Sequence, residues 1–321
     1  VILDESLIHS GDFFGVVRLD GLDPMLGWAM GSTTGHTTVA LRDGDDLYVC
    51  ESTATSSYWK VNGIQCTAYQ TWLANAKAAS FQVVHLPLAP KYRAAFNETA
   101  AWEFFHATEG LDYGYTNMFY GWIDTVKDNY PCAPPDFERC LTWDIIEVLF
   151  PLASKHISQF TNFWNQAFNF RLGSRGLGFA ELLQRANEMK IQPNTIPAIV
   201  EEDSWVYNNT RNGTASSGPS MVCCVFVCHI WKASGMFGDL ADQINCGELT
   251  NWDDYSMLVF DTNYKRPQVC VDADPDNQAC QLLGEYTLNL NNYNTKAPFP
   301  HIAEHCPSMA PNYTKPSNCW E

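Results

Sequence analysis

Cysteine is the residue type that most constrains how this chain can fold. The 321-residue sequence contains twelve cysteines, a number typical of proteins that fold in an oxidising compartment and are held by disulfide bonds. Three pairs are close enough in sequence to be predicted as local disulfides, although spacing alone does not fix connectivity. These pairs are Cys132 with Cys140, Cys270 with Cys280, and Cys306 with Cys319.

Two adjacent cysteines, Cys223 and Cys224, begin a strongly apolar segment that ends at Gly235. The preceding residues, Gly218-Pro219-Ser220, are typical of the break and cap before a helix, so we predict that Cys223 lies in a first helical turn. If Cys223 is a free thiol, eleven cysteines remain and at least one more must be unpaired. We predict that this second free thiol is Cys228, buried in the same helix. The alternative is that Cys223 itself is half of a disulfide.

Three further features agree with a secreted protein or one in a lysosomal or vacuolar lumen. Four N-x-S/T sequons lie in polar stretches where N-linked glycans could be attached, at Asn97, Asn208, Asn212 and Asn312. The sequence does not begin with Met, which favours removal of a signal peptide. A net charge of −17 suits an acidic lumen, where part of that charge is neutralised.

The same charge limits the partners we expect. Nucleic acids and anionic membranes bind clustered Lys and Arg, but 36 acidic side chains outnumber 19 basic ones here. The most apolar run, residues 220–231, is shorter than the ~20 residues that a membrane span needs. We therefore expect no nucleic-acid partner and no transmembrane segment; the oligomeric state stays open.

Short β-type runs joined by turns dominate the first 130 residues. The runs 37–42 and 47–51 flank the turn Asp43-Gly44-Asp45-Asp46 and predict a hairpin. Further strands are expected at 13–19 and 81–88, and helices at 67–79 and from Asn97 to Gly110.

Helical periodicity replaces this pattern after the boundary Pro131–Pro135. Helices are expected at 137–156, 158–171 and 179–189, with Gly173, Gly176 and Gly178 as a connector. From about Arg266 the chain is rich in Pro, Asn and Cys. The prediction is a single α+β domain over 1–321, with a helical insertion at 136–200 and a Cys-rich C-terminal extension at 266–321.

Three residues have the chemistry of a thiol hydrolase. A nucleophilic cysteine is activated at a helix N-terminus, where free N–H groups and the helix dipole stabilise its thiolate, and this favours Cys223. It also needs an imidazole base, for which His36 at the start of a β run is the candidate. The imidazole in turn needs a polar group that fixes its orientation, and Glu51 follows the second arm of the hairpin.

The segment GHTTVALRDGDDLYVCES, preceded by Gly11-Asp12-Phe13-Phe14, resembles one family. It is similar to the His-bearing half of the circularly permuted papain-like hydrolases, the NlpC-type group that includes lecithin:retinol acyltransferase-like enzymes. The resemblance covers about half the chain, residues 9–130 and 218–237. It implies a large, secreted, eukaryotic-type member whose antiparallel sheet packs on the Cys-bearing helix, with Cys223 as nucleophile, His36 as base and Glu51 as orienting acceptor.

The chain departs from this pattern in two places. Thr37-Thr38 stand where the family has a small glycine, and the long interval between His36 and Cys223 requires the helical insertion. Other residues remain alternatives for two of the roles. Cys224 is a rival nucleophile, and Asp45, Asp46 and Ser52 are rivals for the orienting role of Glu51. His36 could also be an ordinary turn histidine.

Other motifs give weaker alternatives. The acidic run Asp272 to Asp276 lacks the glycine and glutamate of a calcium loop, and His301, Glu304, His305 and Cys306 lie in a Pro-rich tail that offers no rigid zinc site. We therefore expect no metal and no cofactor. A cluster of aromatic residues could belong to the hydrophobic core or, if it faces Cys223, line a substrate cleft. The cluster consists of Tyr113, Tyr115, Phe119, Tyr120 and Trp122.

The function expected from these features is hydrolysis of a peptide or amide bond through an acyl-enzyme, with a lipid ester or acyl transfer as the second possibility in the same chemistry. A secreted glycoprotein that keeps the scaffold for binding or assembly without catalysis is the alternative from another class. A cystine-rich structural or storage component is the third.

Overall fold

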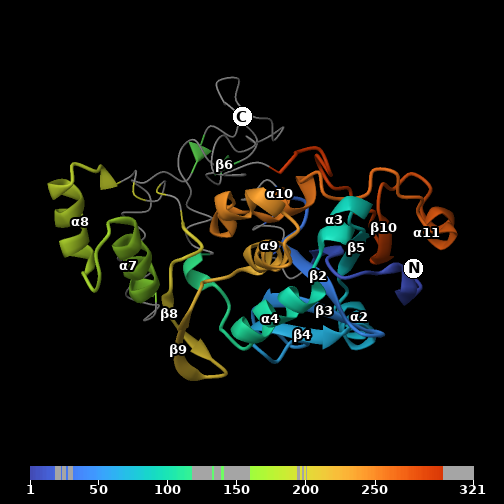
Figure 1. Cartoon of the computed structure of the whole chain (residues 1–321), viewed down its shortest axis with the longest axis horizontal. Coiled ribbons are helices and arrows are strands. Elements are labelled where there is room, and N and C mark those ends of the chain that lie inside the picture. Colours follow the sequence, from blue (N-terminus) through green and yellow to red (C-terminus); the bar gives the residue numbers. More distant parts are fainter. Residues whose placement is uncertain are drawn as a thin grey trace.

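A six-stranded antiparallel sheet forms the centre of the protein in a computed structural model (Figure 1). The structure describes residues 1–18, 23, 27, 32–117, 132–133, 139–140, 160–193, 196, 199 and 201–298. The strand order across the sheet is β10-β5-β1-β2-β3-β4. These strands are β1 (Phe13–Val17), β2 (His36–Asp43), β3 (Asp46–Thr53), β4 (Gly63–Ala68), β5 (Gln82–Leu86) and β10 (Cys280–Leu283).

The β2–β3 hairpin matches the sequence prediction, and its turn explains why. Asp43 pairs with Asp46, so Gly44 and Asp45 alone form the loop. Gly44 has a φ of 60°, the left-handed conformation that tight hairpin turns require and that glycine adopts without steric cost. The hairpin places the start of β2 and the end of β3 at the same end of the sheet.

The helices divide between the two faces of the sheet and a separate cluster (Figure 1). The α-helices are α2 (Tyr69–Ala78), α3 (Pro90–Ala95), α4 (Glu98–Thr108), α7 (Phe160–Arg171), α8 (Phe179–Glu188), α9 (Cys223–Ala233), α10 (Asn251–Ser256) and α11 (Gln268–Ala273). Short 3₁₀ helices are η1 (Glu5–Leu7), η3 (Gly238–Gln243) and η4 (Cys246–Glu248). The fold is therefore mixed α+β.

Helix α9 is buried along most of its length because its sequence is apolar on every side. Every residue from Cys223 to Trp231 is buried, as expected for a helix that lies between a sheet and other elements. Its side chains pack with Phe13, Val39 and Leu86 on one sheet face, while α4 packs beside it. Helix α2 packs on the other face, where Trp72 contacts the cluster around Phe14 and Val49.

Helices α7 and α8 pack against each other around a small apolar cluster of their own. The predicted helices at 158–171 and 179–189 correspond to these two elements, joined by the glycine-rich connector. A helix is expected at 137–156, but Arg139 and Cys140 form a short strand instead, and the rest of that range lies outside the described residues, as do Cys306 and Cys319. Cys132 and Cys140 pair opposite each other in the two-stranded sheet of β6 (Cys132–Ala133) and β7 (Arg139–Cys140).

Three parts of the fold differ from or extend the sequence interpretation. Thr67 and Ala68 end strand β4 instead of beginning a helix, so α2 starts at Tyr69. Strand β10, inside the C-terminal extension, joins the main sheet beside β5. Strands β8 (Tyr207–Arg211) and β9 (Thr214–Gly218) form a hairpin that the sequence interpretation does not include. It turns at Asn212-Gly213, a dipeptide that favours tight hairpin turns.

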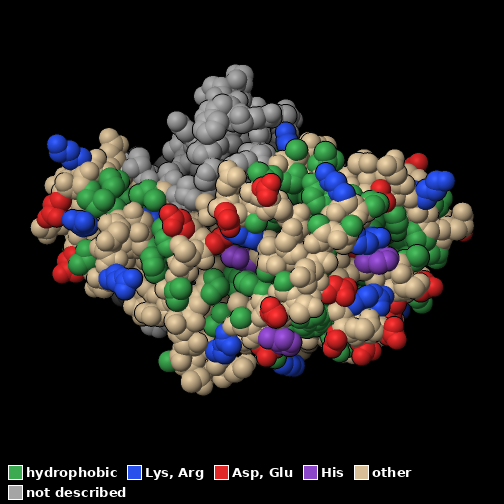
Figure 2. All heavy atoms as spheres, viewed as in Figure 1, with side chains coloured by type: hydrophobic (Ala, Val, Ile, Leu, Met, Phe, Trp, Pro, Cys, Tyr) green, Lys and Arg blue, Asp and Glu red, His purple; other side chains and the backbone are tan. Residues whose placement is uncertain are grey.

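The surface carries both signs of charge. Figure 2 shows acidic and basic side chains interspersed over one face. The sequon residues Asn97, Asn208 and Asn212 are exposed, and Asn312 lies outside the described part of the chain. Within the described ranges, each helix is too short or too polar to cross a bilayer.

Candidate active site

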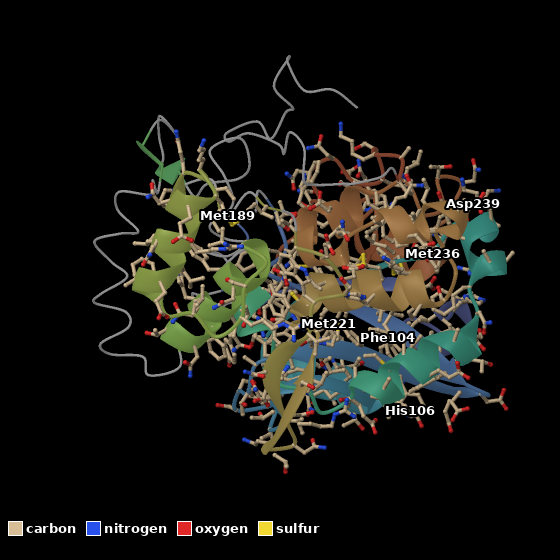
Figure 3. All side chains as sticks on the ribbon, turned by 60° about the vertical axis from the view of Figure 1, so that its left-hand side comes forward. Phe104, His106, Met189, Met221, Met236 and Asp239 are labelled. Atoms are coloured by element: carbon tan, nitrogen blue, oxygen red, sulfur yellow. A yellow bond between two sulfur atoms is a disulfide. The ribbon has the colours of Figure 1, made fainter. Side chains whose placement is uncertain are left out.

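Cys223 is the first residue of α9, as the sequence predicts. The preceding residue, Val222, has extended backbone angles and no side-chain cap is present, so the first-turn N–H groups keep their partial positive charge. Three hydrogen bonds hold the segment before the helix. Met221 O accepts from Ser52 Oγ at 2.7 Å and from Gly114 N at 3.0 Å, while Ser220 Oγ accepts from Asn117 N at 3.0 Å. Figure 3 shows Met221 where the chain leaves β9 and enters α9.

His36 and Glu51 form a buried pair at the end of the β2–β3 hairpin. His36 Nε2 lies 2.6 Å from Glu51 Oε2, and both side chains are at most 2% exposed. The other carboxylate oxygen, Oε1, accepts from Trp59 Nε1 at 2.7 Å and from Trp72 Nε1 at 2.9 Å. Because both oxygens are engaged, Glu51 can orient the imidazole rigidly.

His36 and the Cys223 side chain each shift the pKa of the other, so the three predicted residues lie close together. With Nε2 engaged by Glu51, Nδ1 is the ring nitrogen left for the sulfur. Burial of the ring and the nearby Arg18 guanidinium lower the pKa of His36, but the hydrogen bonds to Cys223 and Glu51 outweigh them. The net effect raises the pKa of His36 to about 9.

The pKa of the Cys223 thiol is shifted in the opposite direction. A hydrogen bond from Cys224 lowers it well below its ordinary value, against the effect of burial, and the hydrogen bond and charge of His36 add to the lowering. The Thr37 backbone N–H adds to this lowering of the pKa. One contact opposes this: Asn251 Oδ1, an acceptor, lies 3.5 Å from Cys223 Sγ and favours the thiol. The balance favours a thiolate–imidazolium pair.

The surroundings of Cys224 favour its protonated thiol, so Cys224 is less suited than Cys223 to act as the nucleophile. Burial raises the pKa of its thiol well above the ordinary value, and the neighbouring Cys223 raises it further. Its Sγ lies 3.2 Å from the Leu249 carbonyl oxygen, which competes with the Cys223 sulfur for the single S–H hydrogen of Cys224. Since the thiolate is the reactive form, this environment makes Cys224 the weaker candidate.

Three polar side chains, Arg18, Tyr113 and Asp254, lie near the Cys223–His36 pair, and of these only Tyr113 was considered from the sequence. Arg18 binds Asp23 through Nε at 2.9 Å and Nη2 at 2.6 Å. Burial raises the pKa of Tyr113 and of Asp254, and the negative charge of Cys223 adds to both shifts. Single residues such as these carry no local sequence pattern, because only the tertiary fold brings them to the site.

The alternatives to Glu51 lie elsewhere in the hairpin. Asp45 and Asp46 are exposed at the turn, at the other end of the strands from His36. Ser52 is buried, but its hydroxyl is engaged with the Met221 carbonyl. Of these acceptors, only Glu51 bonds the His36 ring in the described structure.

The disulfides correct one prediction. Cys228 bonds Cys246, so the expectation of a buried free thiol at Cys228 is wrong. Among the described cysteines, the free thiols are Cys223 and Cys224. Cys270 bonds Cys280, the pair expected from their spacing. Cys50 and Cys66 face each other on β3 and β4 and also form a disulfide, which no spacing rule would select.

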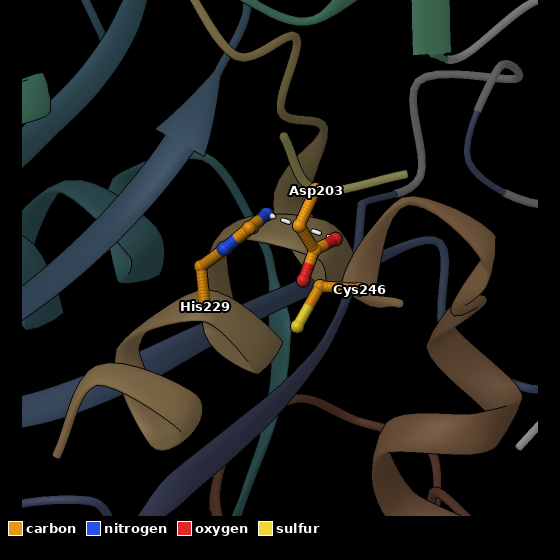
Figure 4. A group of neighbouring side chains, drawn as sticks. All are labelled: Asp203, His229 and Cys246. Atoms are coloured by element: carbon orange, nitrogen blue, oxygen red, sulfur yellow. Dashed lines mark ion pairs between the residues drawn. The ribbon is translucent and has the colours of Figure 1, made fainter. Parts of the chain in front are cut away.

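A second group of potential ligands, Asp203, His229 and Cys246, lies near the middle of α9 (Figure 4). The Cys246 sulfur is already bonded to Cys228. Asp203 Oδ2 pairs with Lys232 Nζ at 2.8 Å, and Asp203 Oδ1 lies 3.6 Å from His229 Nε2. These interactions fit an internal ion pair better than a metal site, since a cation would compete with the Lys232 ammonium.

Of the two weaker metal motifs, the acidic turn lies in the described part of the chain. In the acidic turn, Asp274 Oδ1 accepts from the Asp276 N–H and Oδ2 from Thr287 Oγ1, so both carboxylate oxygens already have partners. His301, Glu304 and His305 lie outside the described residues. Of the aromatic set, Tyr113 and Tyr115 line a cavity beside the site; Phe119, Tyr120 and Trp122 also fall outside the described ranges.

Comparisons with protein-family models, with curated proteins and with solved structures found no match.

Proposed function

We propose that this chain is a thiol hydrolase of the permuted papain-like type that cleaves an amide or peptide bond. The observation that carries the proposal is the contiguous set Cys223–His36–Glu51, in which a low-pKa thiol begins a helix and its imidazole partner is fixed by a buried carboxylate. The same three roles define cysteine nucleophile sites in general.

The chemistry would proceed in two steps. The Cys223 sulfur attacks the carbonyl carbon and forms an S–C bond, and N–H groups of the first turn of α9 stabilise the oxyanion. When the C–N bond breaks, the His36 imidazolium gives its proton to the leaving nitrogen. A water molecule then loses a proton to His36 and attacks the thioester, which releases the acid and restores the thiolate–imidazolium pair.

The alternative is a catalytically silent glycoprotein that uses this scaffold for binding. One observation favours it: Cys223 is only 4% exposed and His36 only 1%. An attacking thiolate must reach a substrate carbonyl, so catalysis requires these atoms to become accessible when substrate binds. In both cases the three disulfides among the described residues and the exposed sequons support a secreted or lumenal protein.

Labelling with a small thiol-directed electrophile tests the proposal. The native chain is treated with iodoacetamide at pH 6, where an ordinary thiol is protonated and slow, and the modified residue is mapped by mass spectrometry. We expect rapid, selective modification of Cys223 that is strongly slowed in His36→Ala. A Cys223 that reacts no faster than an ordinary thiol, or that is found in a disulfide, would contradict the proposal and favour the silent scaffold.

A further inference from the structure

A cavity of about 930 Å³ lies beside the candidate active site. It is enclosed by α7, the loop that follows α7, strand β8 and the segment 112–116. Two of its lining residues connect it to the nucleophile. Ser220 lies on the segment that leads into Cys223. Tyr113 lies close enough to Cys223 for the charge of the sulfur to raise the pKa of its phenol.

An aromatic wall runs from the active site into this cavity. The rings of Tyr113 and Tyr115 meet edge to face with centroids 5.4 Å apart. Tyr115 then stacks on Phe163 of α7 at 6.0 Å. A ligand that occupies the cavity would therefore lie along a continuous aromatic surface that begins at Cys223.

Several side-chain amides contribute to the lining. They come from α7 and from β8, and they are Asn162, Asn165, Gln166, Asn169 and Asn209, beside the sequon residue Asn208. The charged residues among the lining are Asp112 and Arg175, which are of opposite sign. In a chain of net charge −17 this lining is close to neutral. Where they are not already paired within the chain, these amides offer donors and acceptors, which matches a ligand whose groups also do both.

One of these amides has an unused acceptor. Asn165 Oδ1 is buried and has no hydrogen-bond partner, whereas a buried polar atom normally has one. By contrast, Asn169 is satisfied internally, because its Oδ1 accepts from Ser174 Oγ and Leu177 N. The oxygen is buried in this structure, so a turn of the Asn165 amide must bring it to the cavity surface before a ligand hydroxyl can donate to it.

The strand beside the cavity does not offer an edge for an extended peptide. Peptides often bind by adding a strand, which requires free main-chain groups. On β8, Asn208 N already donates to Gln166 Oε1 at 2.8 Å, and Thr210 N donates to Asn209 Oδ1 at 2.7 Å. Thr210 O accepts from Asp112 N at 3.0 Å. The groups left for a ligand are side-chain amides and ring faces.

We propose that this cavity binds a neutral saccharide unit of the substrate. Sugar hydroxyls act as donor and acceptor at once and fit the amides, while the C–H faces of a sugar ring pack on Tyr115 and Phe163. The inference deepens the proposed function, since it names the part of the substrate that lies next to the bond attacked by Cys223. It predicts a glycosylated amide, such as a glycopeptide, as the substrate class.

Calorimetric titration of the full-length Cys223→Ser protein tests the inference, because this variant binds without turnover. The protein is produced in a host that adds no N-glycans, so that Asn208 is unmodified. The probes are chitotriose, cellotriose and mannotriose, with trialanine amide as the peptide comparison. We expect at least one trisaccharide to bind and trialanine amide not to bind.

A matched pair of variants locates the site. Asn165→Leu removes the unpaired acceptor with little change of volume, and we expect it to weaken trisaccharide binding about fivefold, the value of one hydrogen bond. Asn187→Leu makes the same change at an exposed position of α8 away from the cavity lining, and binding should not change. Circular dichroism melts of both variants confirm that they fold.

The outcomes separate this inference from the proposed function. Binding of trialanine amide without any trisaccharide, binding of no probe, or equal effects of the two variants would each overturn the saccharide site. None of these results depends on the reactivity of Cys223. Conversely, an unreactive Cys223 with intact trisaccharide binding would overturn the hydrolase and leave the cavity as a saccharide-binding site.

Discussion

Trp72 donates its indole N–H to Glu51 Oε1 at 2.9 Å, so a helix on one face of the sheet fixes the carboxylate that orients His36. Trp59 binds the same oxygen at 2.7 Å. The orientation of the imidazole therefore depends on residues from three separate elements, β2, β3 and α2, together with the loop before β4. Each of these contacts can be removed singly.

Glu51→Gln is expected to reduce the reactivity of Cys223. An amide can still accept from the two indoles, but it withdraws the charge that supports the raised pKa of His36. The imidazolium is then less stable, and the thiolate that it stabilises is less populated at neutral pH. We expect iodoacetamide labelling at pH 6 to slow, by about tenfold for each unit by which the pKa of Cys223 rises above that pH. Unchanged labelling would show that Glu51 does not act on this pair.

The pH profile follows from the two shifted groups. The pKa of Cys223 is lowered and that of His36 is raised to about 9, so the thiolate–imidazolium form occupies the window between them. Cleavage of an amide needs both charges, since the sulfur attacks and the ring protonates the leaving nitrogen. Turnover of an identified substrate should therefore fall as pH rises through about 9 and also fall at acid pH as Cys223 becomes protonated. An alkaline limb near 6.5, the ordinary histidine value, would contradict the raised pKa.

Cys224→Ala distinguishes the two adjacent thiols. The hydrogen bond from Cys224 is the largest cause of the lowered pKa of Cys223, so its loss should move the acid limb of labelling to higher pH while Cys223 remains the modified residue. Cys223→Ala should abolish fast labelling, because the pKa of Cys224 is raised. Fast modification of Cys224 in that variant would make it the nucleophile instead. Peptide mapping at several pH values provides both readouts.

Sequence reasoning could predict the parts of this site that depend on local sequence patterns. The Asp-Gly turn between two β runs predicts the hairpin that carries His36 and Glu51, and the Gly-Pro-Ser break before an apolar run predicts the helix that begins at Cys223. Whether the hairpin and the helix come into contact depends on the tertiary fold, so their contact is a hypothesis when only the order of the residues along the sequence is known.

The remaining contacts have no local signal. Trp59 and Trp72 are separated from Glu51 by a loop and by a strand, and only packing brings their indoles to one oxygen. Cys228 was predicted to be free because it lies in an apolar helix, yet the loop after α9 returns Cys246 to bonding distance. Strand β10 joins the sheet from the far end of the chain, where composition suggested no regular structure.

The Cys228–Cys246 disulfide should support both stability and the site. It closes a loop with a sequence separation of 18 and ties α9 to η4, so the double variant Cys228→Ala/Cys246→Ala should lose about 3 kcal/mol in the free energy of unfolding. Since η4 leads into Leu249, which contacts Cys224, labelling of Cys223 should also slow. The matched control is Cys270→Ala/Cys280→Ala, which removes the disulfide at the β10 edge of the sheet. It should reduce the free energy of unfolding but leave the labelling of Cys223 unchanged. If Cys223 were labelled at the same rate in both double variants, the Cys228–Cys246 disulfide would not support the active site.

Gly114 is expected to be indispensable for placing Cys223. A Cβ at this position would lie 2.4 Å from Met221 N and 2.6 Å from Val222 N. These are backbone atoms that cannot rotate away, so Gly114→Ala must displace the segment that leads into α9. Gly178→Ala is the control, because its nearest contact would be the flexible Glu181 carboxylate at 3.6 Å. We expect Gly114→Ala to lower the melting temperature and to slow Cys223 labelling, whereas Gly178→Ala changes neither; a Gly114→Ala protein with native labelling would show that the approach of segment 112–116 does not set the position of the nucleophile.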